Sequence, residues 1–282
     1  MSSSLELLAE IRQSSERRPF AVLKLAEPLL NTRGVARAGD DAWLVYEQVF
    51  VSAIDEGQIE LAKAVLVILR TRFPSSQRVK RLYGMINEAV GHPDEAKTIY
   101  KEMLEADETN ILASKRLIAL LKSYGHIGET VKQLVAYLDI HNNDFEAWLE
   151  LSNLYLTQNL YPQAAFCMEE VIMQQPANHY FHLCYAEISY SMGNFDLALK
   201  EYLRVVELST DNVRGFYGIK LVADRIRDIR AKPKRDQNAR IDDAPQPATL
   251  DRLSQLATER LVAAYNGAND TCKKTAEEWL KA

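Results

Sequence analysis

The stretch AWLELSNLYLTQNLYPQAAFCMEEVIMQQP, residues 147–176, decides the fold, because it holds two apolar stripes of helical spacing separated by a short polar turn. The residues that define it are Trp148, Leu151, Ser152, Tyr155, Asn159, Ala164 and Pro176. Neither predicted helix can bury its stripe alone, so each needs a neighbour. The stretch therefore predicts a helix–turn–helix unit that belongs to a larger stack.

The same pattern returns every 34 residues from Trp43 to Asn212, which makes five units without an insertion. The turn of each unit carries a residue that tolerates left-handed backbone: Gly57, Gly91, Gly125, Asn159 and Gly193. Five residues further on comes a small side chain: Ala62, Ala96, Thr130, Ala164 and Ala198. This period and these columns are typical of the tetratricopeptide repeat.

Each spacing that recurs in the five units has a physical reason. A left-handed residue closes the first helix of a unit, and a side chain there costs about 1–2 kcal/mol. The small residue is expected where the two helices cross, since a larger one would overpack the contact by about 1–3 kcal/mol. The predicted helix pairs are 43–56/59–72, 77–90/93–106, 111–124/127–140, 145–158/161–174 and 179–192/195–208.

The predicted fold is all-α: a tetratricopeptide-repeat solenoid, a right-handed superhelix of helix pairs with irregular helical caps at both ends. Residues 1–40 form the N-terminal cap, with helices at 5–13 and 19–31 and a loop at 32–40. Five repeats occupy residues 41–212, and residues 213–230 read as one helix of a degenerate sixth repeat. The proline- and charge-rich segment 231–248 is expected to be a flexible or extended linker before C-terminal helices at 249–282, which could cap the array or bind a partner.

The composition disfavours some kinds of binding partner and some cellular locations. The net charge of −5 does not favour nucleic-acid binding, and three cysteines without a CxxC pair suit a reducing compartment. The first 18 residues lack the apolar core of a signal peptide, and no run of 18 apolar residues occurs. We therefore expect no direct membrane span, and any membrane association would pass through partners.

A search for chemistry yields little. Phosphate-binding, dinucleotide, zinc-protease and nucleophile-elbow motifs are absent from the sequence. His179 and His182 lie three residues apart near Cys184, but spacing alone does not make a metal site. The expectation is a protein that is not an enzyme, with no catalytic residue, cofactor or metal.

The first helices of such repeats usually line the inner, concave face of the array, so their second, fifth and ninth positions are candidate contacts. The middle units present basic side chains there, and the later units present apolar and polar ones. The predicted partner-binding residues are Arg78, Arg81, Lys115, Arg116, Leu149, Asn153, Tyr180, Leu183 and Glu187. This pattern favours a bipartite groove for a segment with acidic and apolar anchors, and the alternative is a solvated face that binds nothing.

A free co-chaperone adaptor is a second function to weigh. Such proteins grip the C-terminal carboxylate of a chaperone with lysine at the fifth and asparagine at the ninth position of one unit. The pairs here are Glu47/Val51, Arg81/Met85, Lys115/Ala119, Leu149/Asn153 and Leu183/Glu187, and none combines both residues. The sequence therefore disfavours this carboxylate clamp, and an adaptor that binds other chaperone or peptide tails stays the alternative.

Three stretches carry a more specific resemblance. These are DEGQIELAK (55–63), RFPSSQRVKRLYGMINEAVGHPDEAKTIYKEML (72–104) and AWLELSNLYLTQNLYPQAAFCMEEVIMQQPANH (147–179). They resemble the family of subunit 2 of the endoplasmic reticulum membrane protein complex. The similarity spans roughly residues 40–225, and the run from Phe73 to Arg81 is its most specific part.

The resemblance implies a non-catalytic scaffold on the cytoplasmic face of the endoplasmic reticulum membrane, held there through its partners. The family member works in an insertase for tail-anchored and weakly hydrophobic transmembrane segments. It joins the cytosolic parts of membrane subunits, including subunits 3 and 5, to a cytosolic partner of the subunit 8/9 type. On this resemblance the chain is expected to be part of a hetero-oligomer.

Overall fold

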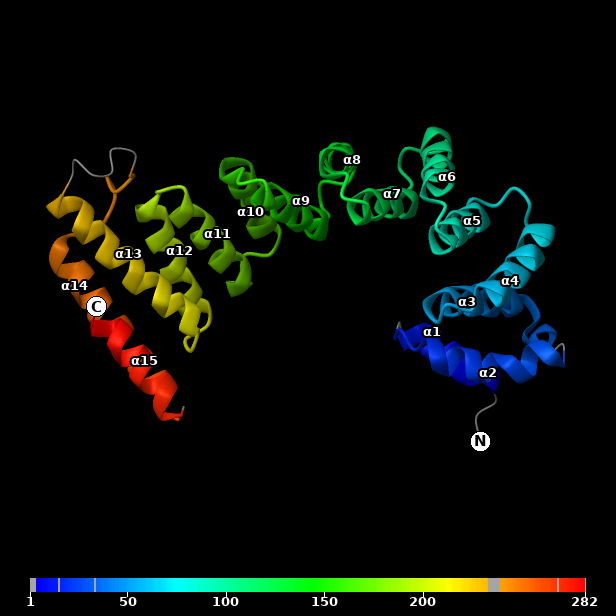
Figure 1. Ribbon diagram of the computed structural model, residues 1–282, viewed down its shortest axis with the longest axis horizontal. Coiled ribbons are helices and arrows are strands. Elements are labelled where there is room, and N and C mark those ends of the chain that lie inside the picture. The colour runs from blue at the N-terminus through cyan, green and yellow to red at the C-terminus, as the bar shows by residue number, and fades with distance from the viewer. Residues whose placement is uncertain (1–3, 15, 33, 233–238, 268, 282) are drawn as a thin grey trace. The chain divides into compact units, whose positions relative to one another are not determined.

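A computed structural model describes residues 4–14, 16–32, 34–232, 239–267 and 269–281. Every regular element in these ranges is a helix, as the sequence predicts. The chain divides into two compact units, Met1–Gln133 and Leu134–Ala282, and the boundary falls inside one helix. Figure 1 labels the helices in chain order, and each unit is described by itself.

The first unit begins with the predicted N-terminal helices α1 (Ser4–Ser14) and α2 (Pro19–Asn31). The three repeats that follow start with α3 (Ala42–Asp55), α5 (Gln77–Val90) and α7 (Ile111–Ser123). Their second helices are α4 (Ile59–Arg72), α6 (Pro93–Ala106) and α8 (Ile127–Ile140), of which α8 continues into the second unit. Each repeat helix in these pairs lies within one residue of the predicted bounds.

The second unit contains the two remaining pairs, α9 (Phe145–Thr157) with α10 (Tyr161–Gln174) and α11 (His179–Ser191) with α12 (Phe195–Leu208). The helix α13 (Val213–Ala231) follows, and then come α14 (Pro247–Ala264) and α15 (Asp270–Lys281). Helix α14 packs along α13, so these two form a sixth helix pair at the end of the unit. The C-terminal helices therefore cap the last repeat.

The repeat turns share one geometry. Gly57, Gly91, Gly125 and Gly193 have φ between 71° and 86°, and Asn159 has φ of 58°. Each of these residues donates its amide to the carbonyl three residues back, and the next amide reaches the carbonyl five residues back, as in Gln58 N to Ala53 O. Both bonds satisfy carbonyls that the helix end would leave unpaired. The left-handed turn residues are confirmed at all five positions.

The small column is buried where the paired helices meet. Ala62, Ala96, Thr130, Ala164 and Ala198 are fully buried, as the crossing model expects. Thr130 is the only one with a polar group, and its hydroxyl donates to His126 O at 2.9 Å, which removes the cost of burying it. A threonine can therefore take the place of alanine in this column.

First helices begin at a column that sequence reasoning did not single out. Asn110, Asp144, Asn178 and Asn212 stand 34 residues apart, each directly before a first helix. Their side-chain oxygens accept the amides of Ala113, Ala147, Tyr180 and Gly215. Such N-caps stabilise a helix by about 1 kcal/mol each, and they mark where α7, α9, α11 and α13 begin, whereas α3 and α5 have no side-chain cap.

Two segments differ from expectation. The predicted loop at 32–40 contains a 3₁₀ helix, Gly34–Asp41, in which Gly39 has positive φ and Val35 is buried. The apolar Val35 draws this segment onto the core of the first unit.

Part of the proline-rich segment 231–248 is hydrogen-bonded to the rest of the second unit, and Arg240 forms an isolated parallel bridge with Asn194. The amide of Arg240 donates to Gly193 O and its carbonyl accepts from Phe195 N, while Arg230 binds the carbonyls of Ala244 and Pro245. These bonds, two from the backbone of Arg240 and two from the guanidinium of Arg230, hold this part of the segment against α12 and α13. Residues 233–238 of the predicted linker lie outside the described residues.

The glycine at position 84, inside a helix, leaves room for a buried tyrosine ring. A Cβ added to Gly84 on α5 would lie 2.5 Å from Tyr100 Cε1, and the Tyr100 ring is fully buried. We expect Gly84→Ala to destabilise the fold by about 1–2 kcal/mol, because overpacking exceeds the gain in helix propensity. Thermal unfolding followed by circular dichroism measures the change. Gly128→Ala on α8 is the control, since its Cβ meets nothing within 4 Å, and an equal loss there would contradict this packing account.

The turn geometry makes a separate prediction at Gly125, whose φ is 75°. Gly125→Val should cost about 1–2 kcal/mol, since a β-branched residue resists left-handed backbone. Gly125→Asn should cost less, because asparagine already occupies the equivalent turn at position 159. Urea unfolding of the two variants tests this order, and equal midpoints would count against the backbone explanation.

Candidate functional site

The predicted contacts lie on a face built from the first helices of successive repeats. Helix α5 contacts α7 in the first unit, and α11 contacts α13 in the second, so this first-helix face is continuous over each pair. Arg78 and Arg81 lie on α5, whereas Lys115 and Arg116 lie on α7. We call these four residues the basic cluster.

Two carboxylates neutralise part of the basic cluster. Glu47 on α3 receives Arg78 Nη2 at 2.6 Å and Arg81 Nη2 at 3.1 Å. Glu88 at the end of α5 receives Arg116 Nη1 at 3.4 Å and the hydroxyl of Tyr100. These bonds join α3 to α5 and α5 to α7, so they also hold neighbouring repeats in register.

Arg81 is the most buried member of the cluster. Its side chain is 17% exposed, and burial lowers the pKa of its guanidinium while the Glu47 carboxylate opposes that shift. Arg78 has a side chain that is 59% exposed, and Lys115 is also exposed. Arg81 thus serves mainly as a structural partner of Glu47, and Arg78 and Lys115 are the more accessible cations.

The excess positive charge on this face is therefore smaller than the four basic residues alone would suggest. The four residues of the basic cluster and the two carboxylates of Glu47 and Glu88 together sum to +2. Exposed ion pairs contribute little, and a partner carboxylate would have to compete with Glu47 and Glu88 for the arginines. An acidic segment would be attracted to this face, but at a more modest strength than four unpaired cations would give.

The second unit presents the remaining candidates unequally. Tyr180 is 49% exposed and Asn153 is exposed, while Glu187 pairs with Arg214 at 2.6 Å. Leu149 is half-buried. Leu183 is only 3% exposed and packs in the core of the second unit, so the structure places it away from the surface where it was expected.

Leu183 shows that a residue's position within its repeat does not by itself predict its exposure. It has the fifth place in its helix, like Arg81, but it belongs to a buried cluster that also includes side chains of α12 and α13. An apolar side chain gains from that cover, whereas a charged one would stay outside. The contact with α13 could not be read from a single repeat.

Of the two histidines near Cys184, His182 has a structural role, whereas His179 is exposed. His182 is buried, with Nδ1 at 2.7 Å from Glu201 Oε2 and Nε2 at 3.0 Å from Pro176 O. Both ring nitrogens face acceptors, so this imidazole links α11 to α12 and to the preceding turn. Among the described residues, no group of three or more His, Cys, Asp or Glu side chains could hold a metal ion.

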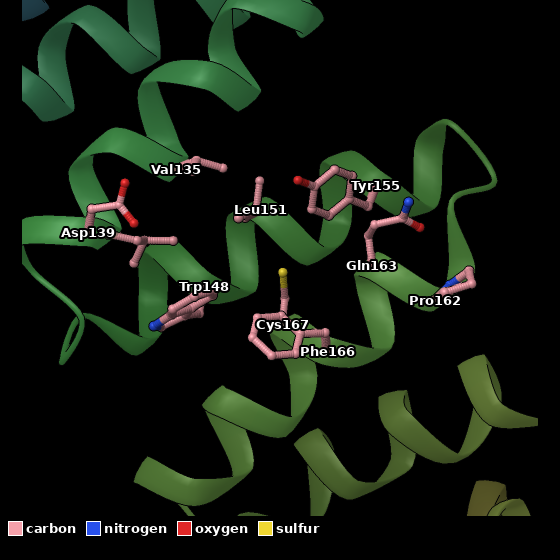
Figure 2. A pocket seen from close by; sticks show the side chains of 10 residues that line it. Val135, Asp139, Trp148, Leu151, Tyr155, Pro162, Gln163, Phe166 and Cys167 are labelled. Atoms are coloured by element: carbon pink, nitrogen blue, oxygen red, sulfur yellow. The ribbon is translucent and has the colours of Figure 1, made fainter.

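A second feature is a cavity of about 520 Å³ in the second unit, between α8 and α10, with α9 as its floor. Figure 2 shows the side chains of Trp148, Leu151 and Tyr155 rising from α9 into it. Val135 and Asp139 line it from α8, and α10 contributes Phe166, Cys167, Pro162 and Gln163. We call it the α9 cavity.

Polar groups in the α9 cavity are few. Burial raises the pKa of the Cys167 thiol to about 12, so the thiol stays protonated and is a poor nucleophile at neutral pH. Burial also raises the pKa of the Tyr155 phenol. The cavity is therefore suited to holding apolar groups.

Comparison with known proteins decides the family. Residues 59–201 match the model of the EMC2 TPR-like repeat domain, which is half of the chain. The chain belongs to this family. A relative from Xenopus laevis, ER membrane protein complex subunit 2-A, is 37% identical over 267 residues, covering 94% of this chain and 86% of its own.

Two further comparisons widen the picture of this EMC2 family member. The TPR repeat protein oca3 of Schizosaccharomyces pombe is 33% identical over 235 residues, covering 78% of this chain and 82% of its own. The crystal structure of the C-terminal part of a TPR repeat-containing protein from Cytophaga hutchinsonii has a TM-score of 0.61, covering 95% of this chain and 96% of its own. That structure is 12% identical, so it supports the tetratricopeptide fold alone.

Within the described ranges of this EMC2 family member, no helix combines the length and the apolar character needed to cross a bilayer. The longest of the described helices, α13, has 19 residues but includes seven charged side chains.

Sequence reasoning missed several residues of both surfaces. Glu47 and Arg81 are 34 residues apart, so their shared column was a usable signal for contact. Glu88 and Arg116 are not separated by the repeat period, so their contact could be found only from the structure. Trp148 and Tyr155 were recognised as repeat residues, but their exposure beside Phe166 follows from how α8 and α10 are placed on α9.

Tyrosine–carboxylate pairs yield a pH prediction. Tyr100 donates to Glu88, Tyr137 to Asp144 and Tyr185 to Glu169, and burial together with these carboxylates raises the pKa of each phenol above its usual value. The folded chain then keeps these protons when the unfolded chain releases them near pH 10. Their contribution to stability is complete below about pH 10 and is lost as the pH rises further.

Melting temperatures measured from pH 8 upward should fall steeply above about pH 10. Tyrosinate absorbance should appear later in the folded chain than in urea. Tyr100→Phe should be less stable at neutral pH and should show a shallower alkaline loss, because one phenol no longer titrates. An identical alkaline slope in the variant and the parent would rule out Tyr100 as a contributor.

Proposed function

We propose that this chain is a non-catalytic scaffold subunit of an endoplasmic reticulum membrane protein complex, placed on the cytoplasmic face of that membrane by its partners. The observation that carries the proposal is the similarity to subunit 2-A of Xenopus laevis over 94% of the chain, at 37% identity. Repeat arrays of this kind act by presenting extended surfaces to other proteins. A subunit that holds others together fits that architecture.

The scaffold role is supported by how the reactive side chains are used. His182 has both ring nitrogens engaged by Glu201 and Pro176, and Cys167 is held as a neutral thiol by burial. Tyr100, Tyr137 and Tyr185 bind carboxylates within the fold. These groups stabilise helix contacts, which is the work expected of a structural subunit.

The partners we propose are the cytosolic segments of membrane subunits, of the subunit 3 and 5 type, and a cytosolic subunit of the 8/9 type. In the first unit the four residues of the basic cluster and the two carboxylates of Glu47 and Glu88 sum to +2, which favours a segment with acidic side chains. In the second unit Leu149, Asn153 and Tyr180 offer a less charged surface for apolar and polar anchors. The assembly would act as an insertase for tail-anchored and weakly hydrophobic transmembrane segments.

Purification from native membranes tests the scaffold role. A tagged full-length chain, recovered from membranes solubilised in mild detergent, should carry several integral membrane proteins in fixed ratio after size exclusion. Quantitative mass spectrometry of the peak measures that ratio. Recovery of soluble chaperones without membrane proteins would instead identify a free co-chaperone adaptor and overturn the proposal.

The first-helix face can be tested separately. Arg78→Gln combined with Lys115→Gln should weaken recovery of at least one membrane subunit several-fold, because these cations are exposed and their loss leaves the Arg81–Glu47 pair intact. Arg204→Gln on α12 is the matched control, since that arginine pairs with Glu207 three residues later on the same helix. Equal recovery for both variants at low salt would remove the basic cluster from the proposed interface. Charge reversal at Arg81 is avoided, because it would set two carboxylates together.

A further inference from the structure

The α9 cavity lies on the opposite side of α9 from the first-helix face. Leu151 and Tyr155 point into the cavity, whereas Leu149 and Asn153, two residues away from Leu151 on either side, belong to the other surface. We propose that this cavity is a second docking site, which receives the apolar face of an amphipathic helix from a partner protein. A basic residue of that helix would meet Asp139.

The dimensions of the α9 cavity fit two turns of a helix. Trp148, Leu151 and Tyr155 follow one another along one side of α9, over a rise of about 10 Å. Its volume of about 520 Å³ is comparable to that of small-molecule pockets, roughly 300–1,000 Å³, and leaves room for several apolar side chains. Side chains spaced i, i+4 and i+7 on a helix would project into a trough of this length.

The walls of the cavity leave apolar surface in water. Phe166 is 54% exposed and Val135 is 39% exposed, although Leu151 and Cys167 beneath them are buried. The rings of Trp148 and Phe166 meet edge to face with centroids 6.0 Å apart, and a hydrogen bond from Trp148 Nε1 to Asn142 O at 2.9 Å fixes the indole. A preorganised aromatic wall of this kind gives a partner apolar contact at little entropic cost.

Charge distinguishes the two ends of the cavity. Among the residues that line it from α8, α9 and α10, Asp139 is the one that carries a charge. Asp139 lies one residue before the end of α8, where the helix dipole adds partial negative charge. The other end is bounded by Pro162 at the start of α10, which is the positive end of that helix. A lysine or arginine at the Asp139 end of the occupant is therefore favoured.

The surroundings also favour a helix over an extended segment. The lining comes from three helices, whose backbone groups are already paired within each helix. An extended peptide would press unpaired amides and carbonyls against apolar side chains, and each would cost about 1–3 kcal/mol. A helix satisfies its own backbone and presents only side chains.

The probe is a fluorescein-labelled, lactam-stapled helix of about 14 residues, stapled because unconstrained helices of that length are marginal in water. It carries leucine at i, i+4 and i+7, arginine one turn before the first leucine, and alanine or glutamine elsewhere. A second peptide replaces the arginine with glutamate. Because anchors rather than an exact sequence are recognised, a designed helix tests the cavity directly.

Fluorescence anisotropy with the purified full chain should show saturable binding, with the arginine peptide bound about tenfold more tightly than the glutamate peptide. Phe166→Ala should weaken binding of the arginine peptide about tenfold, because it removes one apolar wall. Asp139→Lys should reverse the preference between the two peptides. Both residues are exposed, and unchanged melting temperatures would show that the fold is intact.

Met173→Ala is the matched control, since Met173 is on α10 and 70% exposed but outside the cavity lining. Arg78→Gln should also leave peptide binding unchanged, which separates this site from the first-helix face. The proposal fails if neither peptide saturates, if Met173→Ala weakens binding as much as Phe166→Ala, or if Asp139→Lys leaves the preference unaltered. It also fails if Phe166→Ala abolishes self-association or binding to phosphatidylcholine vesicles while no peptide binds.

Discussion

The whole architecture depends on a left-handed residue that closes the first helix of each repeat. At Gly57, Gly91, Gly125, Asn159 and Gly193 the chain reverses through one pair of backbone hydrogen bonds. Because the reversal is identical, the second helix always returns at the same angle and meets the first at a residue that must be small. A right-handed residue at this point would extend the first helix and displace everything after it.

The regular spacing of the repeats also brings oppositely charged side chains of neighbouring repeats together. Glu47 and Arg81 are one repeat apart and meet across α3 and α5, and Lys97 meets Glu129 across α6 and α8 in a similar way. These charged side chains therefore pair between neighbouring repeats of the array. What is left for partners is a modest positive excess on one face and an aromatic cavity on another.

Much of the fold could be predicted from the sequence, because turn, crossing and helix stripe each impose a local requirement that repeats. The helix bounds, the left-handed Asn159 and the buried Thr130 are examples. The site was predicted less well. Leu183 is buried in a cluster that includes side chains of α13, Arg81 is paired with Glu47, and part of the segment 231–248 is held by Gly193 and Arg230, and all three outcomes depend on neighbours outside the repeat concerned.

The contact between Glu47 and Arg81 bears on how such an array could gain or lose repeats during evolution. The fifth-position column reads Glu47, Arg81, Lys115, Leu149 and Leu183. Deleting the 34 residues that contain Arg81 would bring Lys115 to the same carboxylate, and the opposite charges would still meet. Deleting two repeats would set Glu47 against Leu149 and leave the carboxylate stranded. The order of charges along the column thus permits some rearrangements of the array and opposes others.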